Sequence, residues 1–133
     1  MNTKESIGKE KNGGSGTLIF QDGSVYTGTF FADQMHGKGK YVWKNKNEYE
    51  GEWKYNKMEG NGIFLFSDSR KYVGKYVNDK KEGFGVFTWP NGKIYKGQWK
   101  QGKQHGEGQM FCPSEKTWKN GEWYEGRRVK WKD

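Results

Sequence analysis

The feature that most constrains the fold is a repeat of 23 residues that runs through almost the whole chain. Glycine pairs of the form G-x-G begin at Gly14, Gly37, Gly60, Gly83 and Gly106. A tyrosine column with the same step consists of Tyr26, Tyr49, Tyr72 and Tyr95, with Trp118 in fifth place. Further aromatic columns recur with the same step of 23 residues, so the chain consists of copies of one structural unit.

Each period contains two segments in which aromatic or glycine residues alternate with polar ones. Residues 49–53 read Y-E-G-E-W, and residues 60–66 read G-N-G-I-F-L-F. This alternation places the aromatic and glycine residues on one face of a strand. Turn signals such as Pro90-Asn91-Gly92-Lys93 separate the strands. The sequence therefore predicts an all-β fold: an elongated, single-layer, twisted antiparallel meander of stacked β-hairpins with about ten strands.

The composition explains how one layer is stable. Only 31% of the residues are hydrophobic, 17% are aromatic, and 21 are glycine. Because glycine has no side chain, a ring on the same face can lie flat over the neighbouring backbone, and each ring buries about 150–250 Å². We expect one face of the sheet, the ring face, to carry these aromatic residues. Stability should come from neighbouring repeats, since a single glycine-rich hairpin is weak.

The repeat boundaries suggest one array, residues 13–126, between two short ends. The predicted units are a polar tail 1–12, a half repeat 13–25, repeats 26–48, 49–71, 72–94 and 95–117, a C-terminal cap 118–126 and a basic tail 127–133. The turns at 45–47 and 67–69 lack glycine, and we expect Asn, Asp and Ser to form them. Gly97 and Gly121 are 24 residues apart, one more than the period, which predicts a bulge or irregular turn in the cap.

The columns resemble the MORN repeat (membrane occupation and recognition nexus). Residues 49–53 match its opening Y-E-G-E-W, and residues 95–99 with the H-G-x-G at 105–108 match nearly as well. The resemblance covers about residues 14–126. It implies binding: members of this family serve membrane–cytoskeleton linkage, ciliary and axonemal assemblies and parasite cytoskeletal rings. Some enzymes, including plant phosphatidylinositol phosphate kinases, carry such repeats beside a separate catalytic domain.

The sequence offers no set of catalytic residues. The two histidines, His36 and His105, each precede a glycine pair, and we interpret them as structural turn residues. Cys112 occupies an aromatic column and is expected to pack as a small hydrophobe. The glycine pairs do not fit a phosphate-binding loop. We therefore predict no enzyme activity, no cofactor and no metal site. The single cysteine and the lack of a long apolar stretch favour a reducing compartment, so we expect the chain to act in the cytoplasm.

Two surfaces are candidates for binding a protein partner. On the face opposite the rings, three successive strands turn apolar, and the candidates there are Ile63, Leu65, Val73, Val77, Phe84 and Val86. Exposed apolar patches of this kind mark interfaces, although strand propensity alone also enriches such residues. On the ring face, a groove would be lined by Trp43, Trp53, Tyr76, Trp89 and Trp99. The open sheet edges also allow self-association.

The chain has a formal net charge of +8, which suits an acidic protein, an anionic lipid surface or plain solvation. Candidates for an anionic surface are Lys38, Lys40 and Lys44, which alternate along one expected strand, and Arg127, Arg128, Lys130 and Lys132. No nucleic-acid-binding module accompanies this charge. We predict a structural docking module in a cytoskeletal assembly such as a ciliary axoneme. The alternative is a peripheral membrane tether that binds anionic phospholipids.

Overall fold

The structure is a computed structural model that describes residues 3–7 and 14–132. Its strands form one 12-stranded antiparallel sheet in which the spatial order equals the sequence order. The strands are β1 Thr3–Ile7, β2 Ser15–Phe20, β3 Val25–Phe31, β4 Gln34–Val42, β5 Glu48–Lys54, β6 Lys57–Leu65, β7 Lys71–Val77, β8 Lys80–Thr88, β9 Ile94–Lys100, β10 Lys103–Cys112, β11 Thr117–Tyr124 and β12 Arg127–Lys132. The predicted all-β meander is confirmed.

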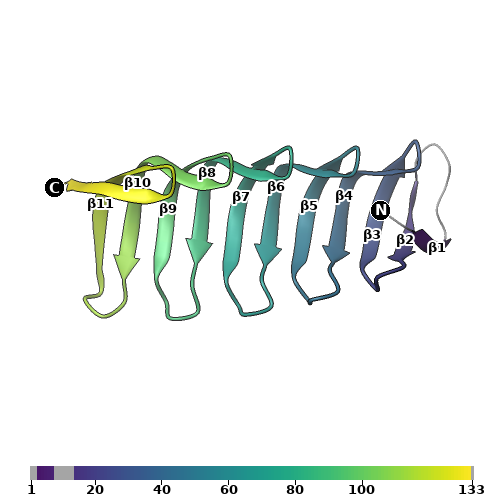
Figure 1. The fold of residues 1–133 in the computed structure, drawn as a ribbon, viewed down its shortest axis with the longest axis horizontal. Coiled ribbons are helices and arrows are strands. Elements are labelled where there is room, and N and C mark those ends of the chain that lie inside the picture. Colours follow the sequence, from purple (N-terminus) through teal and green to yellow (C-terminus); the bar gives the residue numbers. More distant parts are fainter. Residues whose placement is uncertain (1–2, 8–13, 133) are drawn as a thin grey trace.

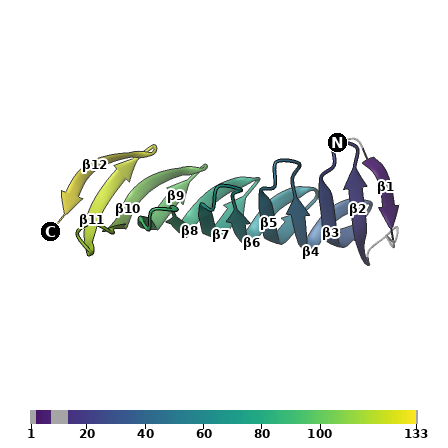
Figure 2. The same cartoon turned by 90° about the horizontal axis from the view of Figure 1, so that it is seen from below.

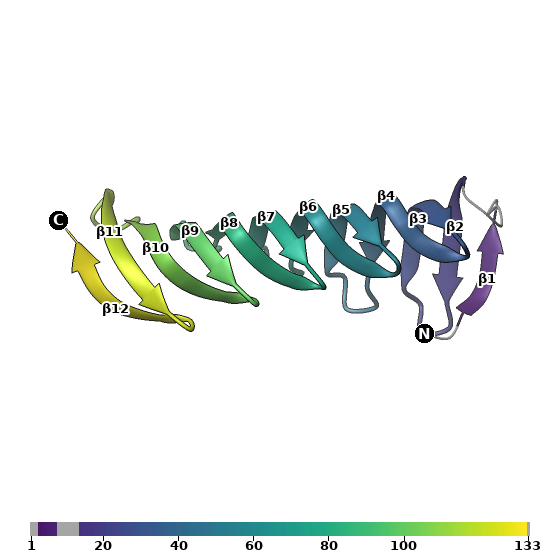
Figure 3. The same ribbon diagram turned by 90° about the horizontal axis from the view of Figure 1, so that it is seen from above.

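The sheet is an open ribbon. β1 and β12 lie at opposite ends of its long axis, and each pairs with a single neighbour (Figure 2). The hairpins stand side by side along this axis (Figure 1), and the longer strands β4, β6, β8 and β10 arch across its width (Figure 3). Each hairpin therefore contacts only the hairpins beside it, as expected for a repeat array.

Two kinds of turn alternate along the ribbon. The tight turns have positive φ at both central residues, which is the type I′ geometry that suits the twist of a hairpin. They are Ala32-Asp33, Tyr55-Asn56, Asn78-Asp79, Gln101-Gly102 and Glu125-Gly126. Four of them reach back to the preceding repeat: for example, the Asn56 N–H donates to the Met35 carbonyl (2.9 Å), and the Asn56 side chain accepts from the Met35 N–H (2.8 Å). The turns thus join successive hairpins.

The longer turns after β2, β4, β6 and β8 follow one pattern with or without glycine. In the turn after β8, Gly92 has a φ of 94° and the Asn91 side chain accepts from the Lys93 N–H (2.9 Å). In the two turns that lack glycine, Lys46 (φ 76°) and Ser69 (φ 80°) take the same left-handed conformation. Side chains of Asn45 and Asp68 close these turns in the same way, which confirms that both segments turn.

The two glycines of each pair have different roles. The first, as in Gly60 with a φ of 101°, adopts a left-handed conformation, and the strand pairing shifts between Gly51 and Trp53 on the strand opposite it. This is the position of a β-bulge, which bends the strand. The second, as in Gly62, pairs directly with Gly51 and leaves room for a ring. From the sequence alone, only the ring-packing role is expected for both.

Four pairs of facing glycines, each between the two strands of a tight hairpin, hold one tyrosine apiece. A Cβ at Gly51 or Gly62 would overlap the Tyr49 ring or the paired backbone, and Tyr49 is fully buried. Its hydroxyl donates to the Glu52 carbonyl (3.0 Å). The same arrangement, which we call the tyrosine cradle, recurs at Tyr26, Tyr72 and Tyr95. Burial raises the pKa of all four tyrosines, because it removes solvent from the anion.

A second row of rings packs edge-on against the cradles. The Trp53 ring lies at about right angles to those of Tyr26 and Tyr49, with centroids 5.5 and 5.2 Å away. Its Nε1 donates to the Gly39 carbonyl (3.0 Å), so the buried indole is satisfied. In the same way, the Nε1 of Trp99 donates to the Gly85 carbonyl (3.2 Å). Interlocked rings on one face thus form the core of a sheet with no second layer.

Both ends differ from the predicted division. The segments expected to be tails contain strands: β1 lies within 1–12, and β12 occupies most of 127–133. In the cap, the extra residue changes the register, so Lys119 pairs with Met110 where the other repeats place their tyrosine. Trp118, predicted to continue the tyrosine column, instead pairs with Phe111 on the opposite face and is 43% exposed. That prediction was wrong, because one added residue reverses which face a strand residue points to.

Candidate partner-binding surfaces

An apolar patch lies on the face opposite the rings, which we call the back face. Ile63 pairs directly with Val73, and Val73 pairs directly with Val86, so the three form a row across β6, β7 and β8. Leu65 and Phe84 extend this row along their own strands. The exposed fractions of Ile63, Leu65, Val73 and Phe84 are 43%, 41%, 41% and 57%, and Val86 is half-buried. These five residues are the back-face patch.

Val77 was grouped with this patch from the sequence, and the structure places it elsewhere. It is 37% exposed but pairs with Lys80 beside the tight turn between β7 and β8. Glu50 and Lys96 flank the row in register, Glu50 opposite Ile63 and Lys96 opposite Val86. The patch therefore has an apolar centre with one acidic and one basic neighbour.

A surface hollow of about 550 Å³ borders the patch. Its lining includes Ile63, Val73, Gly62 and Gly74, so it lies over the backbone of the paired glycines, between side chains of the back face. A partner side chain placed there would contact backbone as well as the apolar row.

The ring-face candidates divide into two groups. Trp53, Tyr76 and Trp99 are only 5%, 3% and 7% exposed, because neighbouring rings already cover them. Trp43 and Trp89 are partly exposed and pack at the margin of the core. Phe64 and Phe66 share that margin and were not among the sequence-based candidates, although their column was recognised. The surface available to a partner on this face is therefore the margin row Trp43, Phe64, Phe66 and Trp89.

The basic residues near the amino-terminal end lie on two elements. Lys38 and Lys40 are exposed on β4, and Lys40 is paired with Glu48 (3.2 Å). Lys44 is exposed but lies in the turn after β4, which ends at Val42. The expectation that the three alternate along one strand was therefore wrong for Lys44.

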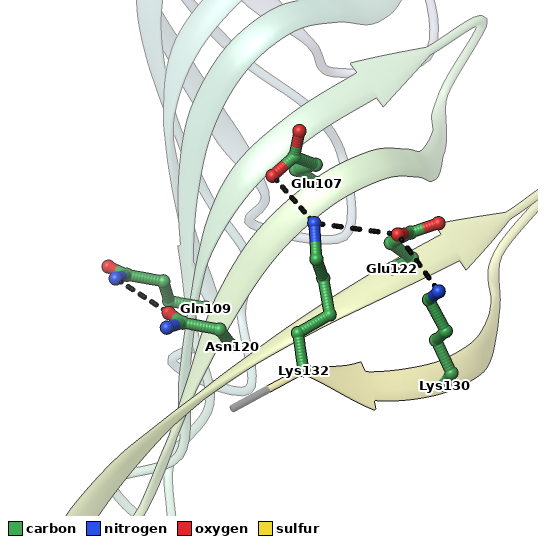
Figure 4. A network of polar contacts seen from close by, with 6 residues as sticks. All are labelled: Glu107, Gln109, Asn120, Glu122, Lys130 and Lys132. Carbon is green, nitrogen blue, oxygen red and sulfur yellow. Dashed lines mark hydrogen bonds and ion pairs between the residues drawn. The ribbon is translucent and has the colours of Figure 1, made fainter.

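At the other end, much of the basic charge is neutralised within the chain. Lys132 contacts both Glu107 (3.1 Å) and Glu122 (3.5 Å), and Lys130 contacts Glu122 (3.7 Å), as Figure 4 shows. The hydrogen bond to Glu107 raises the pKa of Lys132. Arg127 and Arg128 are exposed, and the Arg128 guanidinium lies 4.4 Å from the centroid of the Trp131 ring. The charge open to an anionic partner here is smaller than the sequence suggests.

Both histidines are tied to turns. The Nδ1 of His36 accepts from the Tyr55 N–H (3.3 Å), and the Nδ1 of His105 accepts from the Glu125 N–H (3.3 Å). In the two repeats between them, the equivalent acceptors are carboxylates: Glu59 accepts from the Asn78 N–H, and Glu82 accepts from the Gln101 N–H. This confirms the structural interpretation of the histidines. Cys112 is partly buried and packs against the core, in agreement with the expected small hydrophobe.

One residue outside the sequence-based candidates stands out on the ring face. Lys81 pairs with Tyr76 at the start of β8, where the equivalent residues of β4 and β6 are Met35 and Met58. Its ammonium lies 5.5 Å from the Tyr72 ring centroid, 5.8 Å from that of Phe87 and 5.4 Å from that of Trp99. A residue-by-residue comparison of the repeats would have found it, since Met35, Met58, Lys81 and Gln104 are each 23 apart.

The described part of the chain contains neither a cluster of His, Cys, Asp and Glu suited to a metal ion nor a helix long and apolar enough to span a membrane. The arrangement offers exposed surfaces on both faces of the sheet. What it can do chemically is contact apolar, aromatic and charged groups of another molecule.

The comparisons with known proteins agree with the geometry. The chain is 38% identical over 42 residues to an inactive protein tyrosine kinase, pTKL, of Plasmodium berghei (strain Anka). That match covers 32% of this chain and 3% of the relative, so the chain spans a small fraction of the relative's length. The sequence pattern of the MORN repeat matches residues 13–25, 26–48, 49–69, 72–94 and 95–117. With these matches covering most of its length, the chain belongs to the MORN repeat family.

Proposed function

We propose that this chain is a non-catalytic docking module that binds protein partners in a cytoskeletal assembly, such as a ciliary axoneme, through the back-face patch. MORN repeats carry no catalytic residues of their own and serve as binding modules for proteins or membranes. The observation that carries the choice of surface is the in-register row Ile63–Val73–Val86, with Leu65 and Phe84 beside it. Contiguous exposed apolar side chains of this kind are typical of interfaces.

Membrane tethering is less well supported by the charge distribution. Lys40, Lys130 and Lys132 already have carboxylate partners within the chain. Each basic residue near an anionic bilayer contributes only about 1 kcal/mol, so a tether needs several that are free. A protein partner that covers the apolar row and meets Glu50 and Lys96 at its margins fits the surface better.

The test is a double substitution on the back face, Leu65→Lys with Val86→Lys, in the tagged chain expressed in its source cells. Complexes are purified at low and at high salt and identified by mass spectrometry. We expect the unmodified chain to retain stoichiometric protein partners at high salt and the double variant to lose them. Two lysines in an apolar interface leave unpaired buried charges, which weakens binding strongly.

Val129→Lys is the matched control, since Val129 is 59% exposed and lies on β12, away from the patch. Circular dichroism checks that each variant folds. Partners that stay bound to the folded double variant would refute this surface. Pelleting with phosphatidylserine vesicles that falls steeply with salt, without a salt-stable protein complex, would favour the tether instead.

A further inference from the structure

Lys81 occupies a position that the two preceding repeats fill with a methionine and the next repeat fills with Gln104. Met35 and Met58, its equivalents in the two preceding repeats, are 2% and 9% exposed. They pair with Phe30 and Trp53, as Lys81 pairs with Tyr76. Lys81 is therefore the one charged residue among the four equivalent positions, and two of the others are buried methionines.

The ammonium of Lys81 is held among rings without an anionic partner. Three ring centroids lie within about 6 Å, the range of a cation–π contact. In the part of the chain that the structure describes, no carboxylate lies within ion-pair distance of Lys81. Burial and then the nearby Arg70 lower the pKa of Lys81, so its charge is less favourable here than in water.

Two more cations lie over the margin row beside this site. The Arg70 guanidinium is 4.3 Å from the centroid of Phe66, and the Lys93 ammonium is 5.2 Å from that of Trp89. Arg70 is also paired with Asp68 (2.8 Å). The middle of the ring face thus presents partly exposed rings together with positive charge, and of these three cations only Arg70 has a carboxylate partner among the described residues.

We propose that this surface, formed by Lys81, Arg70, Lys93, Phe66 and Trp89, binds an acidic apolar peptide segment of a protein partner. A Glu or Asp of the segment accepts hydrogen bonds from the Lys81 ammonium, and its apolar neighbours cover the rings of Phe66 and Trp89. Charge complementarity selects the acidic residue, because a carboxylate supplies the partner that Lys81 lacks. This site is on the opposite face from the back-face patch and does not depend on it.

The test is a selection of random displayed peptides on the folded chain, followed by affinity measurements with the synthesised winners. We expect the selected peptides to combine an acidic residue with aromatic or aliphatic residues. Lys81→Met should weaken their binding roughly tenfold or more, since it removes a charge-assisted hydrogen bond. The same variant should raise the melting temperature, because methionine is buried at the equivalent positions of the two preceding repeats.

Lys75→Met is the matched control, since Lys75 is an exposed lysine on the back face, and it should bind the peptides normally. The double variant of Leu65 and Val86 should also bind them, which separates this proposal from the proposed function. The proposal would be overturned if the selected peptides lacked acidic residues or if no peptide were selected. It would also be overturned if the Lys81→Met variant bound the peptides as tightly as the unmodified chain. So would binding of phosphatidylserine vesicles, but not of peptides, that is lost in Lys81→Met.

Discussion

Tyr49 and Lys119 take the same place in their hairpins, and the two regions around them are held together differently. Tyr49 pairs with Tyr41, lies over Gly51 and Gly62, and is fully buried. Lys119 pairs with Met110 in the equivalent register, its side chain is 41% exposed, and its ammonium contacts Glu115 (3.3 Å). The central repeats are joined by buried rings, whereas the cap has polar contacts at this position.

The cap fills its space by another route. Its glycine, Gly121, pairs on one side with Gly108 but on the other with Trp131, so no second glycine cradle forms. The Trp131 ring stands at right angles to that of Trp123, with centroids 6.0 Å apart. A repeat that has a neighbour on each side needs flat rings and paired glycines. The last unit covers itself with a tryptophan from its own closing strand.

High pH should have the largest effect on stability, because it acts through the buried tyrosines of the central repeats. Burial raises the pKa of Tyr26 and Tyr95 to about 12, and it raises the pKa of Tyr49 and Tyr72 as well. A raised pKa means that the unfolded chain loses these protons first, from about pH 10. Their contribution to stability is therefore complete below pH 10 and is lost as the pH rises toward 12.

We expect cooperative loss of the whole sheet in this window. Circular dichroism should report the unfolding, and ultraviolet absorbance should report tyrosinate formation at the same pH. Tyrosinate that appears fully while the sheet remains intact would contradict the cradle, since the rings would then be reachable by hydroxide in the folded state.

A methyl group added at the second glycine of a cradle should have the next largest effect. In Gly62→Ala the new Cβ overlaps the Tyr49 ring, which is fixed between backbone and other rings. Such overpacking costs about 3 kcal/mol of the free energy of unfolding. Urea denaturation measures this cost.

Gly121→Ala is the comparison within the cap. There the nearest atoms to a Cβ are the Lys130 carbonyl oxygen and the Trp131 ring, both at 3.0 Å, and small shifts of the end strand relieve the contact. We expect a loss of less than about 1 kcal/mol. Equal losses at the two positions would show that the cradle has no special demand for glycine.

The fold followed from the sequence because the cradle leaves a periodic mark. Tyrosine and glycine are both required at fixed offsets, so their columns reveal the strands, the face and the pairing. The direction of Trp118 was not predictable from the same columns. Counting by 23 placed it with the tyrosines, but the inserted residue in the turn 113–116 moved Lys119 into that register instead.

The binding surfaces were less accessible to sequence reasoning. Alternation showed that Ile63, Val73 and Val86 share the back face, yet their direct pairing depends on the register between strands. Burial of Trp53, Tyr76 and Trp99 by their neighbours depends on ring orientation, which no column records. Ion pairs such as Lys132 with Glu107 join residues 25 positions apart, and the cap register sets that contact.

The smallest expected effect concerns the links between hairpins, in which His36 and His105 act toward the two ends of the array and Glu59 and Glu82 act in the two repeats between them. In the cap, His105 accepts from the Glu125 N–H (3.3 Å), whereas in the preceding repeat Glu82 accepts from the Gln101 N–H (3.0 Å). His105→Ala removes the acceptor and should lower the free energy of unfolding by about 0.5–1.5 kcal/mol. His105→Glu installs the residue type of the central repeats and should restore or exceed the original stability, because a carboxylate is the stronger acceptor. If urea denaturation finds the Glu variant as unstable as the Ala variant, the two acceptors are not equivalent and the cap depends on the imidazole ring itself, which lies 5.2 Å from the Tyr124 ring.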